Sequence, residues 1–120
     1  MLFVPKKNLV LIGGRGCGKS SIARRIKREN KHFTLFEVDA LIRYELNGLT
    51  IHQIVETYGW RRFRDVEYDV VRKVAAFPSG ALVDAGGWVV VDLDDAGNEV
   101  YSERKVEALR EHSLIVYLYR

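Results

Sequence analysis

The chain has 120 residues, of which 48% are hydrophobic and 29% are charged, and this is the length and balance of one globular domain. That balance excludes a long disordered chain. No apolar run approaches the roughly 20 residues that cross a bilayer, so we expect no membrane association. The N-terminus lacks the pattern of a secretory signal, and the single cysteine cannot form an intramolecular disulfide. We therefore expect a cytoplasmic protein.

Charge is unevenly distributed, although the net charge is only +3. The first 31 residues hold nine basic residues and one acidic residue. Several of these basic residues fall on one predicted helix, with no interleaved aromatic side chains on which nucleic-acid bases could stack. We interpret them as a solvated helix face and expect no nucleic-acid partner. The three scattered histidines and the one cysteine do not have the spacing of a zinc site.

Strands and helices alternate along the chain, which predicts a layered α/β domain with a mainly parallel sheet. The mainly apolar segments Leu2–Val4 and Asn8–Ile12 predict a buried strand. The predicted elements are a strand over 8–12, helices over 19–30, 39–46, 50–58 and 60–77, strands over 32–38, 81–84, 88–93, 98–102 and 113–119, and a helix over 103–112. The strands over 88–93 and 98–102 form a predicted β-hairpin.

Three local signals support these boundaries. Asn47-Gly48 is a helix stop, Thr50 is a helix N-cap, and Gly59 separates two helices. An apolar stripe marks the longest helix and consists of Phe63, Val66, Val70, Val74 and Phe77. The strand over 113–119 is strongly apolar and has no covering helix after it. Because an uncovered apolar edge invites aggregation, we expect that the chain is a shortened version of a longer domain.

A phosphate-binding motif lies between the first predicted strand and the first predicted helix. Its residues are Gly13-Gly14-Arg15-Gly16-Cys17-Gly18-Lys19-Ser20, which match G-x-x-x-x-G-K-[ST]. The glycines allow successive backbone N–H groups to face an anion, and the helix N-terminus adds its positive dipole. Lys19 would reach the β- and γ-phosphates of ATP, and the Ser20 hydroxyl would bind Mg²⁺. The predicted fold is therefore a three-layer α/β/α domain of the P-loop NTPase type, over residues 1–120.

Polar residues at other strand ends are candidates for binding the phosphate acceptor, because open α/β sheets bind ligands at that edge. Glu37 and Asp39 follow the second strand, and Asp84 and Gly86-Gly87 follow the third. Arg64 on the longest helix offers a bidentate fork for a substrate carboxylate.

These segments together resemble the shikimate kinases in order and spacing. The matching segments are 13–21, Phe36-Glu37-Val38-Asp39, Phe63-Arg64-x-x-Glu67 and Val83-Asp84-Ala85-Gly86-Gly87, and the likeness extends over nearly all 120 residues. The resemblance implies transfer of the γ-phosphoryl group of ATP to the 3-hydroxyl of shikimate. We expect the protein to be a monomer.

The resemblance also implies roles for individual residues. Lys19 and Asp39 would be catalytic, with Asp39 contacting the acceptor hydroxyls as the candidate base. Asp39, Arg64, Gly86 and Gly87 would bind shikimate, and Ser20 and Glu37 would hold Mg²⁺. The implied nucleotide contacts are Gly13, Gly14, Arg15, Gly16, Cys17, Gly18, Lys19, Ser20 and Ser21.

The chain departs from the family pattern in three places. Glu37 stands where the family usually has aspartate, so the carboxylate lies one methylene further from the backbone. Trp88 stands where the family usually has a third glycine after the two that match Gly86 and Gly87. Its side chain is either a pocket wall or part of the hairpin core. The family's lid and a later substrate-binding arginine would lie beyond residue 120, so we expect this chain to lack them.

Simpler interpretations remain open for several of these residues. Asp39 could cap the helix that begins there, and Glu37 could be a solvated strand end. Arg64 could be an exposed helix residue paired with Glu67 or Asp65. Arg61 and Arg62 are expected to be solvated, Cys17 to be a small tolerated side chain, and 92–103 to contain a plain turn rather than a calcium loop. Two functional alternatives are a kinase for another small hydroxylated acid and a non-catalytic nucleotide-binding remnant.

Overall fold

The computed structural model describes residues 7–13, 18–111 and 113–118, except for the side chains at 87 and 88. The predicted alternation of strands and helices is confirmed. The elements in chain order are β1 (Asn8–Gly13), α1 (Lys19–Glu29), β2 (Thr34–Glu37), α2 (Val38–Glu45), α3 (Ile51–Ala75), β3 (Ala81–Gly86), η1 (Gly87–Val90), β4 (Val91–Leu93), β5 (Glu99–Tyr101), α4 (Glu103–Arg110) and β6 (Ser113–Tyr117).

Four of the strands form a parallel sheet in the order β2-β3-β1-β6. Gly13, the last residue of β1, pairs with Gly86, the last residue of β3. Glu37, the last residue of β2, pairs with Asp84. The carboxyl ends of β1, β2 and β3 therefore meet at one edge, and this edge is where parallel α/β sheets bind their ligands.

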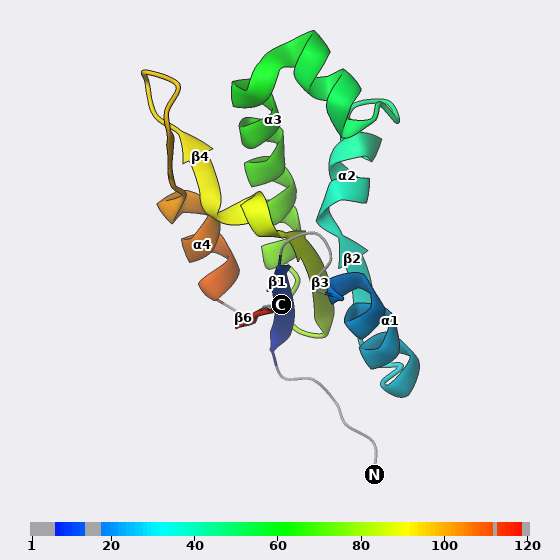
Figure 1. Cartoon of the computed structure of the whole chain (residues 1–120). Helices are drawn as coiled ribbons and strands as arrows, with labels where there is room; N and C mark the ends of the chain where they lie inside the picture. Colours follow the sequence, from blue (N-terminus) through cyan, green and yellow to red (C-terminus); the bar gives the residue numbers. More distant parts are fainter. Residues whose placement is uncertain (1–6, 14–17, 112, 119–120) are drawn as a thin grey trace.

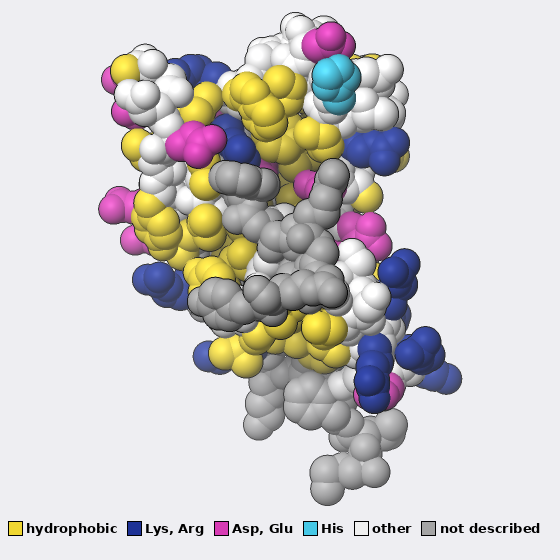
Figure 2. Space-filling model, viewed as in Figure 1, with side chains coloured by type: hydrophobic (Ala, Val, Ile, Leu, Met, Phe, Trp, Pro, Cys, Tyr) yellow, Lys and Arg dark blue, Asp and Glu magenta, His cyan; other side chains and the backbone are white. Residues whose placement is uncertain are grey.

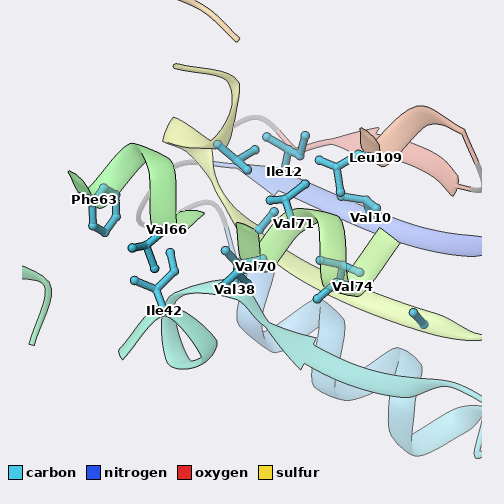
Figure 3. Close-up of a cluster of buried hydrophobic side chains, with 14 of the residues drawn as sticks. Val10, Ile12, Val38, Ile42, Phe63, Val66, Val70, Val71, Val74 and Leu109 are labelled. Atoms are coloured by element: carbon cyan, nitrogen blue, oxygen red, sulfur yellow. The ribbon is translucent and has the colours of Figure 1, made fainter. Parts of the chain in front are cut away.

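Alternate residues of the strands face two separate apolar layers, as expected for a parallel sheet covered on both sides. Leu11 and Leu82 pack with Ala23 of α1. Val10 and Val83 face the opposite layer, whose helical members come from α2, α3 and α4. Figure 1 shows α1 and α4 on opposite sides of the strands. Figure 3 shows Val66 and Val70 of α3 beside Ile42 and Val38 of α2, and Val71 on the side of β1. The predicted three-layer domain is confirmed.

The helix around Gly59 is continuous in outline but contains a kink. Gly59 has φ 84° and ψ 165°, which is not helical, so two helices meet at the predicted position. Thr50 begins the first of them with a capping box, in which its hydroxyl accepts from the Gln53 N–H and the Gln53 side chain accepts from the Thr50 N–H. The apolar stripe is buried from Phe63 to Val74. The helix ends at Ala75, so its predicted extension to Phe77 is wrong.

The hairpin begins later than predicted. Residues 87–90 form a short 3₁₀ turn, and only Val91–Leu93 pairs with Glu99–Tyr101 in an antiparallel ladder. The predicted strand start at Trp88 is therefore wrong, because apolar residues in a 3₁₀ turn cannot be distinguished from a strand by composition. The 94–98 segment is a plain turn, as the sequence predicts. The Asp94 carboxylate accepts hydrogen bonds from the Ala96 and Asn98 N–H groups.

The basic residues of the N-terminal third lie on a solvated helix face. Figure 2 shows Lys and Arg side chains gathered at the lower right, where Figure 1 places α1. Arg24, Arg25 and Arg28 of that helix are exposed. In the four-stranded sheet, β6 is the edge strand opposite β2, and its residues Leu114 and Tyr117 are exposed. Within the described ranges, no helix combines the length and the apolar character needed to cross a membrane.

Candidate active site

The described part of the phosphate-binding motif has the geometry that the sequence predicts. Gly13 ends β1, and Lys19 and Ser20 are the first two residues of α1. Gly18 precedes the helix with φ 82°, a left-handed conformation that favours glycine. Ser21 is exposed in the first turn, which contains no acidic residue that could compete with a phosphate. The predicted contacts Gly14, Arg15, Gly16 and Cys17 lie outside the described residues.

Asp84, which the sequence indicates only as a strand-end candidate for acceptor binding, contacts both Lys19 and Ser20 of the phosphate-binding motif. Asp84 Oδ1 lies 2.7 Å from Lys19 Nζ, and Ser20 Oγ donates to Asp84 Oδ2 at 3.2 Å. The Asp84 side chain is 8% exposed and the Lys19 side chain 16%. The signal in the sequence was the apolar run 81–83 ending in aspartate, since P-loop enzymes place a metal-associated aspartate at the end of such a strand.

Two of the predicted acceptor residues, Asp39 and Gly86, lie close to each other at the end of β3, the strand that carries Asp84. A Cβ built on Gly86 would lie 3.9 Å from Asp39 Oδ1, so the Asp39 carboxylate faces the end of β3. Asp39 is the second residue of α2, and Glu37 holds the N-cap position without a side-chain capping bond. The interpretation of Asp39 as the helix cap is therefore wrong. Glu37 is exposed, and its strand partner is Asp84, which places it at the same edge.

Arg64 is buried rather than exposed, so its interpretation as a surface helix residue is wrong. It is 6% exposed, and its Nη1 donates to Glu67 Oε1 at 3.1 Å. Its guanidinium carbon lies 5.4 Å from the ring centroid of Trp60 and 5.3 Å from that of Phe63. Aromatic rings and one carboxylate thus fix the orientation of the guanidinium group.

Two arginines next to Arg64 and the glycines after β3 were also considered in the sequence analysis. Arg61 and Arg62 are exposed, as expected, and Arg61 donates to the Asp94 carbonyl at 2.7 Å. Gly87 begins the 3₁₀ turn directly after Gly86. The side chain of Trp88 lies outside the described part of the structure. Whether it is a pocket wall or part of the hairpin core therefore stays a prediction.

Glu67 has a second buried partner on a different element. Lys105 of α4 donates to the same Oε1 oxygen that accepts from Arg64, and also to the Val91 carbonyl of β4. Glu67 is 3% exposed and Lys105 is 0% exposed. Burial raises the pKa of the Glu67 carboxyl, against the opposing effect of Lys105 and Arg64. Burial also lowers the pKa of the Lys105 ammonium, against the opposing effect of Glu67.

A second ionic network lies nearby, centred on Arg104 of α4. Its guanidinium donates to both oxygens of Asp92, at 2.7 and 2.8 Å, and to Asp65 of α3 at 3.0 Å. It also lies 4.6 Å from the ring centroid of Tyr68. Ser102 donates to Asp92 at 2.6 Å, and its oxygen accepts from the Lys105 N–H at the start of α4. The hairpin, α4 and α3 are therefore joined by two ionic clusters.

The described residues contain no group of three or more His, Cys, Asp or Glu side chains that could hold a metal ion alone. A groove of about 380 Å³ lies between α2 and α3, and none of the predicted site residues lines it. It is lined by Glu45, Leu46, Arg62, Val66, Asp69, Arg72, Lys73 and Ala76. We place the candidate site at the carboxyl edge of the sheet, where the charged side chains converge.

A family model and curated relatives indicate the same family. A family model described as shikimate kinase matches residues 15–120. The curated shikimate kinase of Leptospira biflexa is 41% identical over 113 residues, which are 94% of this chain and 61% of that protein. The shikimate kinase of Leptospira borgpetersenii is 35% identical over 112 residues, 92% of this chain and 62% of that protein. The chain thus spans about 61% of the length of these relatives.

Solved structures support the fold. A shikimate kinase from Acinetobacter baumannii in complex with shikimate has a TM-score of 0.78 and 24% identity, over 95% of this chain and 56% of that one. The shikimate kinase from Aquifex aeolicus has a TM-score of 0.75 and 22% identity, over 94% of this chain and 60% of that one. At these identities the likeness establishes a common architecture.

Proposed function

Because the chain belongs to the shikimate kinase family, we propose that it binds ATP and shikimate and transfers the γ-phosphoryl group to the 3-hydroxyl of shikimate. The observation that carries this proposal is the convergence of two sets of side chains at one sheet edge. Lys19, Ser20 and Asp84 form the phosphate side. Asp39 lies against Gly86, two residues beyond Asp84 on the same strand, and forms the acceptor side.

Each side has a chemical task in an in-line transfer. The Lys19 ammonium stabilises negative charge on the β- and γ-phosphates, and the start of α1 directs its N–H groups to the same place. The Asp39 carboxylate accepts a hydrogen bond from the acceptor hydroxyl and takes its proton as the new P–O bond forms. Arg64 binds the shikimate carboxylate and fixes the direction from which the hydroxyl attacks.

The residues of the site fit a magnesium ion. Mg²⁺ prefers oxygen donors and is usually held by one or two carboxylates together with phosphates and waters. The Ser20 hydroxyl and the Asp84 carboxylate are such donors and lie 3.2 Å apart. We infer that these two residues hold the ion, and that Glu37, the strand partner of Asp84, orients its waters. When bound, the ion neutralises charge on the transferred phosphate.

The direct test is a calorimetric titration of the 120-residue chain with shikimate, with and without Mg-ADP, together with an assay of ADP release. We expect saturable binding of both compounds and ADP release that requires both substrates. Binding of Mg-ADP without binding of shikimate would favour a different hydroxylated acid as the acceptor. Binding of both without ADP release would favour a nucleotide-binding remnant. We also propose a cytoplasmic, monomeric protein with no nucleic-acid partner.

A further inference from the structure

Glu67 is shared between a residue of the proposed acceptor site and a residue outside it. Its Oε1 oxygen accepts hydrogen bonds from Arg64 of α3 and from Lys105 of α4. All three side chains are buried, and the least exposed of them is Lys105. Burial of a charged lysine is expensive unless it compensates another charge, so its presence requires an explanation in terms of its partners.

The position of Lys105 is fixed from two directions. Ser102 caps α4 by accepting the Lys105 N–H, and the Ser102 N–H donates to the Val90 carbonyl at 2.7 Å. The Lys105 ammonium donates to the carbonyl of Val91, the next residue along the chain. The backbone at the start of α4 and the ammonium are therefore both held by the segment that follows Gly86 and Gly87.

The charges of the cluster suggest what Lys105 does. Arg64 and Glu67 alone would form a neutral pair, in which the carboxylate cancels the charge of the arginine. Lys105 and Glu67 together are neutral wherever their shared proton resides, because an ammonium beside a carboxylate and an amine beside a carboxylic acid have the same total charge. With Lys105 present, the side chains of Arg64, Glu67 and Lys105 together carry one net positive charge.

We propose that Lys105 is a positioning residue for acceptor binding: it neutralises Glu67 and thereby leaves the positive charge of Arg64 available to the carboxylate of shikimate. This inference rests on the proposed function. A buried cation in a low-dielectric setting attracts a substrate carboxylate strongly only when no closer anion cancels it. Glu67 keeps its part in orienting the guanidinium, while Lys105 removes the electrostatic cost of having that carboxylate there.

The test compares shikimate affinity in charge-balanced and charge-unbalanced variants. In Lys105→Met the carboxylate of Glu67 cancels Arg64, so we expect Kd for shikimate to rise at least about tenfold while Kd for Mg-ADP changes less than twofold. In the double variant Glu67→Gln/Lys105→Met the single charge of Arg64 is restored, and glutamine still offers an oxygen to the guanidinium. We expect the double variant to bind shikimate within about fivefold of the wild type.

The matched control is Arg104→Met, which removes an arginine that joins α4 to Asp65 of α3 without contacting Glu67. We expect it to lower the melting temperature and to leave Kd for shikimate within twofold. If Lys105→Met does not fold, the double variant, which keeps the single charge of Arg64, still tests the inference, because loss of its shikimate binding would contradict it. Wild-type shikimate affinity in Lys105→Met would overturn the inference. So would a folded double variant that has lost shikimate binding, because lost packing rather than charge would then explain both results.

The same titrations separate this inference from the function on which it rests. A wild-type chain that does not bind shikimate would overturn the proposed function and this inference with it. A wild-type chain that binds shikimate, with no difference among the variants, would overturn only the role of Lys105.

Discussion

Asp84 is a single carboxylate with two partners, and it connects the two halves of the proposed site. It binds the motif residues Lys19 and Ser20 through its side chain. Through its strand it is two residues from Gly86, which faces Asp39. Because β3 is buried from Ala81 to Ala85, the carboxylate projects from a rigid support. A rigid support is what phosphoryl transfer requires, since its catalysis is mostly the positioning of charge.

Replacement of Lys19 by alanine tests the phosphate side. Removal of the ammonium takes away one of the groups that compensate the charge on the transferred phosphate, so we expect turnover to fall by about a hundredfold or more. ADP release measured at saturating shikimate checks this. Lys31→Ala removes an exposed lysine and is the control. Equal turnover in Lys19→Ala and wild type would contradict the role of the motif.

Replacement of Arg64 by alanine tests the acceptor side. Loss of a charge-assisted fork to the substrate carboxylate should weaken shikimate binding by about 2–4 kcal/mol. Calorimetry gives this value directly. The neighbouring variant Arg61→Ala removes an exposed arginine and should leave the affinity unchanged. An unaltered shikimate affinity in Arg64→Ala would remove this residue from the site.

At the scale of elements, the bend at Gly59 sets the angle between the two helical parts of α3, residues 51–58 and 60–75. With φ 84° and ψ 165°, this residue occupies a backbone region that is essentially restricted to glycine. A Cβ built there would meet no atom within 4 Å, so any cost of substitution comes from the backbone itself. Trp60 and Arg64, which follow the bend, depend on it for their direction.

We expect Gly59→Ala to lower the free energy of unfolding by about 1–3 kcal/mol. Urea denaturation followed by circular dichroism would measure the change. Thr57→Ala, an exposed substitution two residues earlier on the same helix, should change stability by less than about 0.5 kcal/mol. A stability equal to that of wild type in Gly59→Ala would mean that the bend is not maintained in solution.

A feature could be predicted from the sequence when adjacent residues determine it, and could not when residues far apart in the chain determine it. The glycine-rich motif, the Thr50 cap and the Gly59 break are properties of a few adjacent residues. The described ends of the motif, the cap and the break lie where the sequence indicates. Lys105 is the opposite case. In the sequence it is a lysine in a charged helix, which favours the surface, and only the packing of α4 on α3 brings it to Glu67. Long-range ion pairs leave no local trace.

At the scale of the whole molecule, the network around Asp92 makes the stability depend on pH. Arg104 and Ser102 donate to this carboxylate and hold its pKa below the usual 3.8, against the opposing effect of burial. The unfolded chain therefore binds a proton at a higher pH than the folded chain does. The stabilisation is fully present above pH 3.8 and is lost as the pH falls through the lower pKa of the folded state.

We expect Asp92→Asn to be less stable than wild type near neutral pH and to lose less stability on acidification. Urea midpoints measured from neutral pH down to the pH of acid unfolding would show two curves that converge. Asp95→Asn, an exposed substitution in the adjacent turn, should run parallel to wild type. Parallel curves for Asp92→Asn would contradict the assigned network.

The sheet order also determines when the molecule can form. β1 is made first, yet its neighbours are β3 and β6, so that Leu9 pairs with Leu82 on one side and Leu114 on the other. Closing such long loops slows folding. During synthesis the central strand β1 therefore has no partner until β3 has been made, and it gains its second neighbour only with β6. A nascent chain that ends before Ala81 contains the phosphate-binding motif but lacks β3, so nucleotide binding should appear only after residues 81–86 have been synthesised.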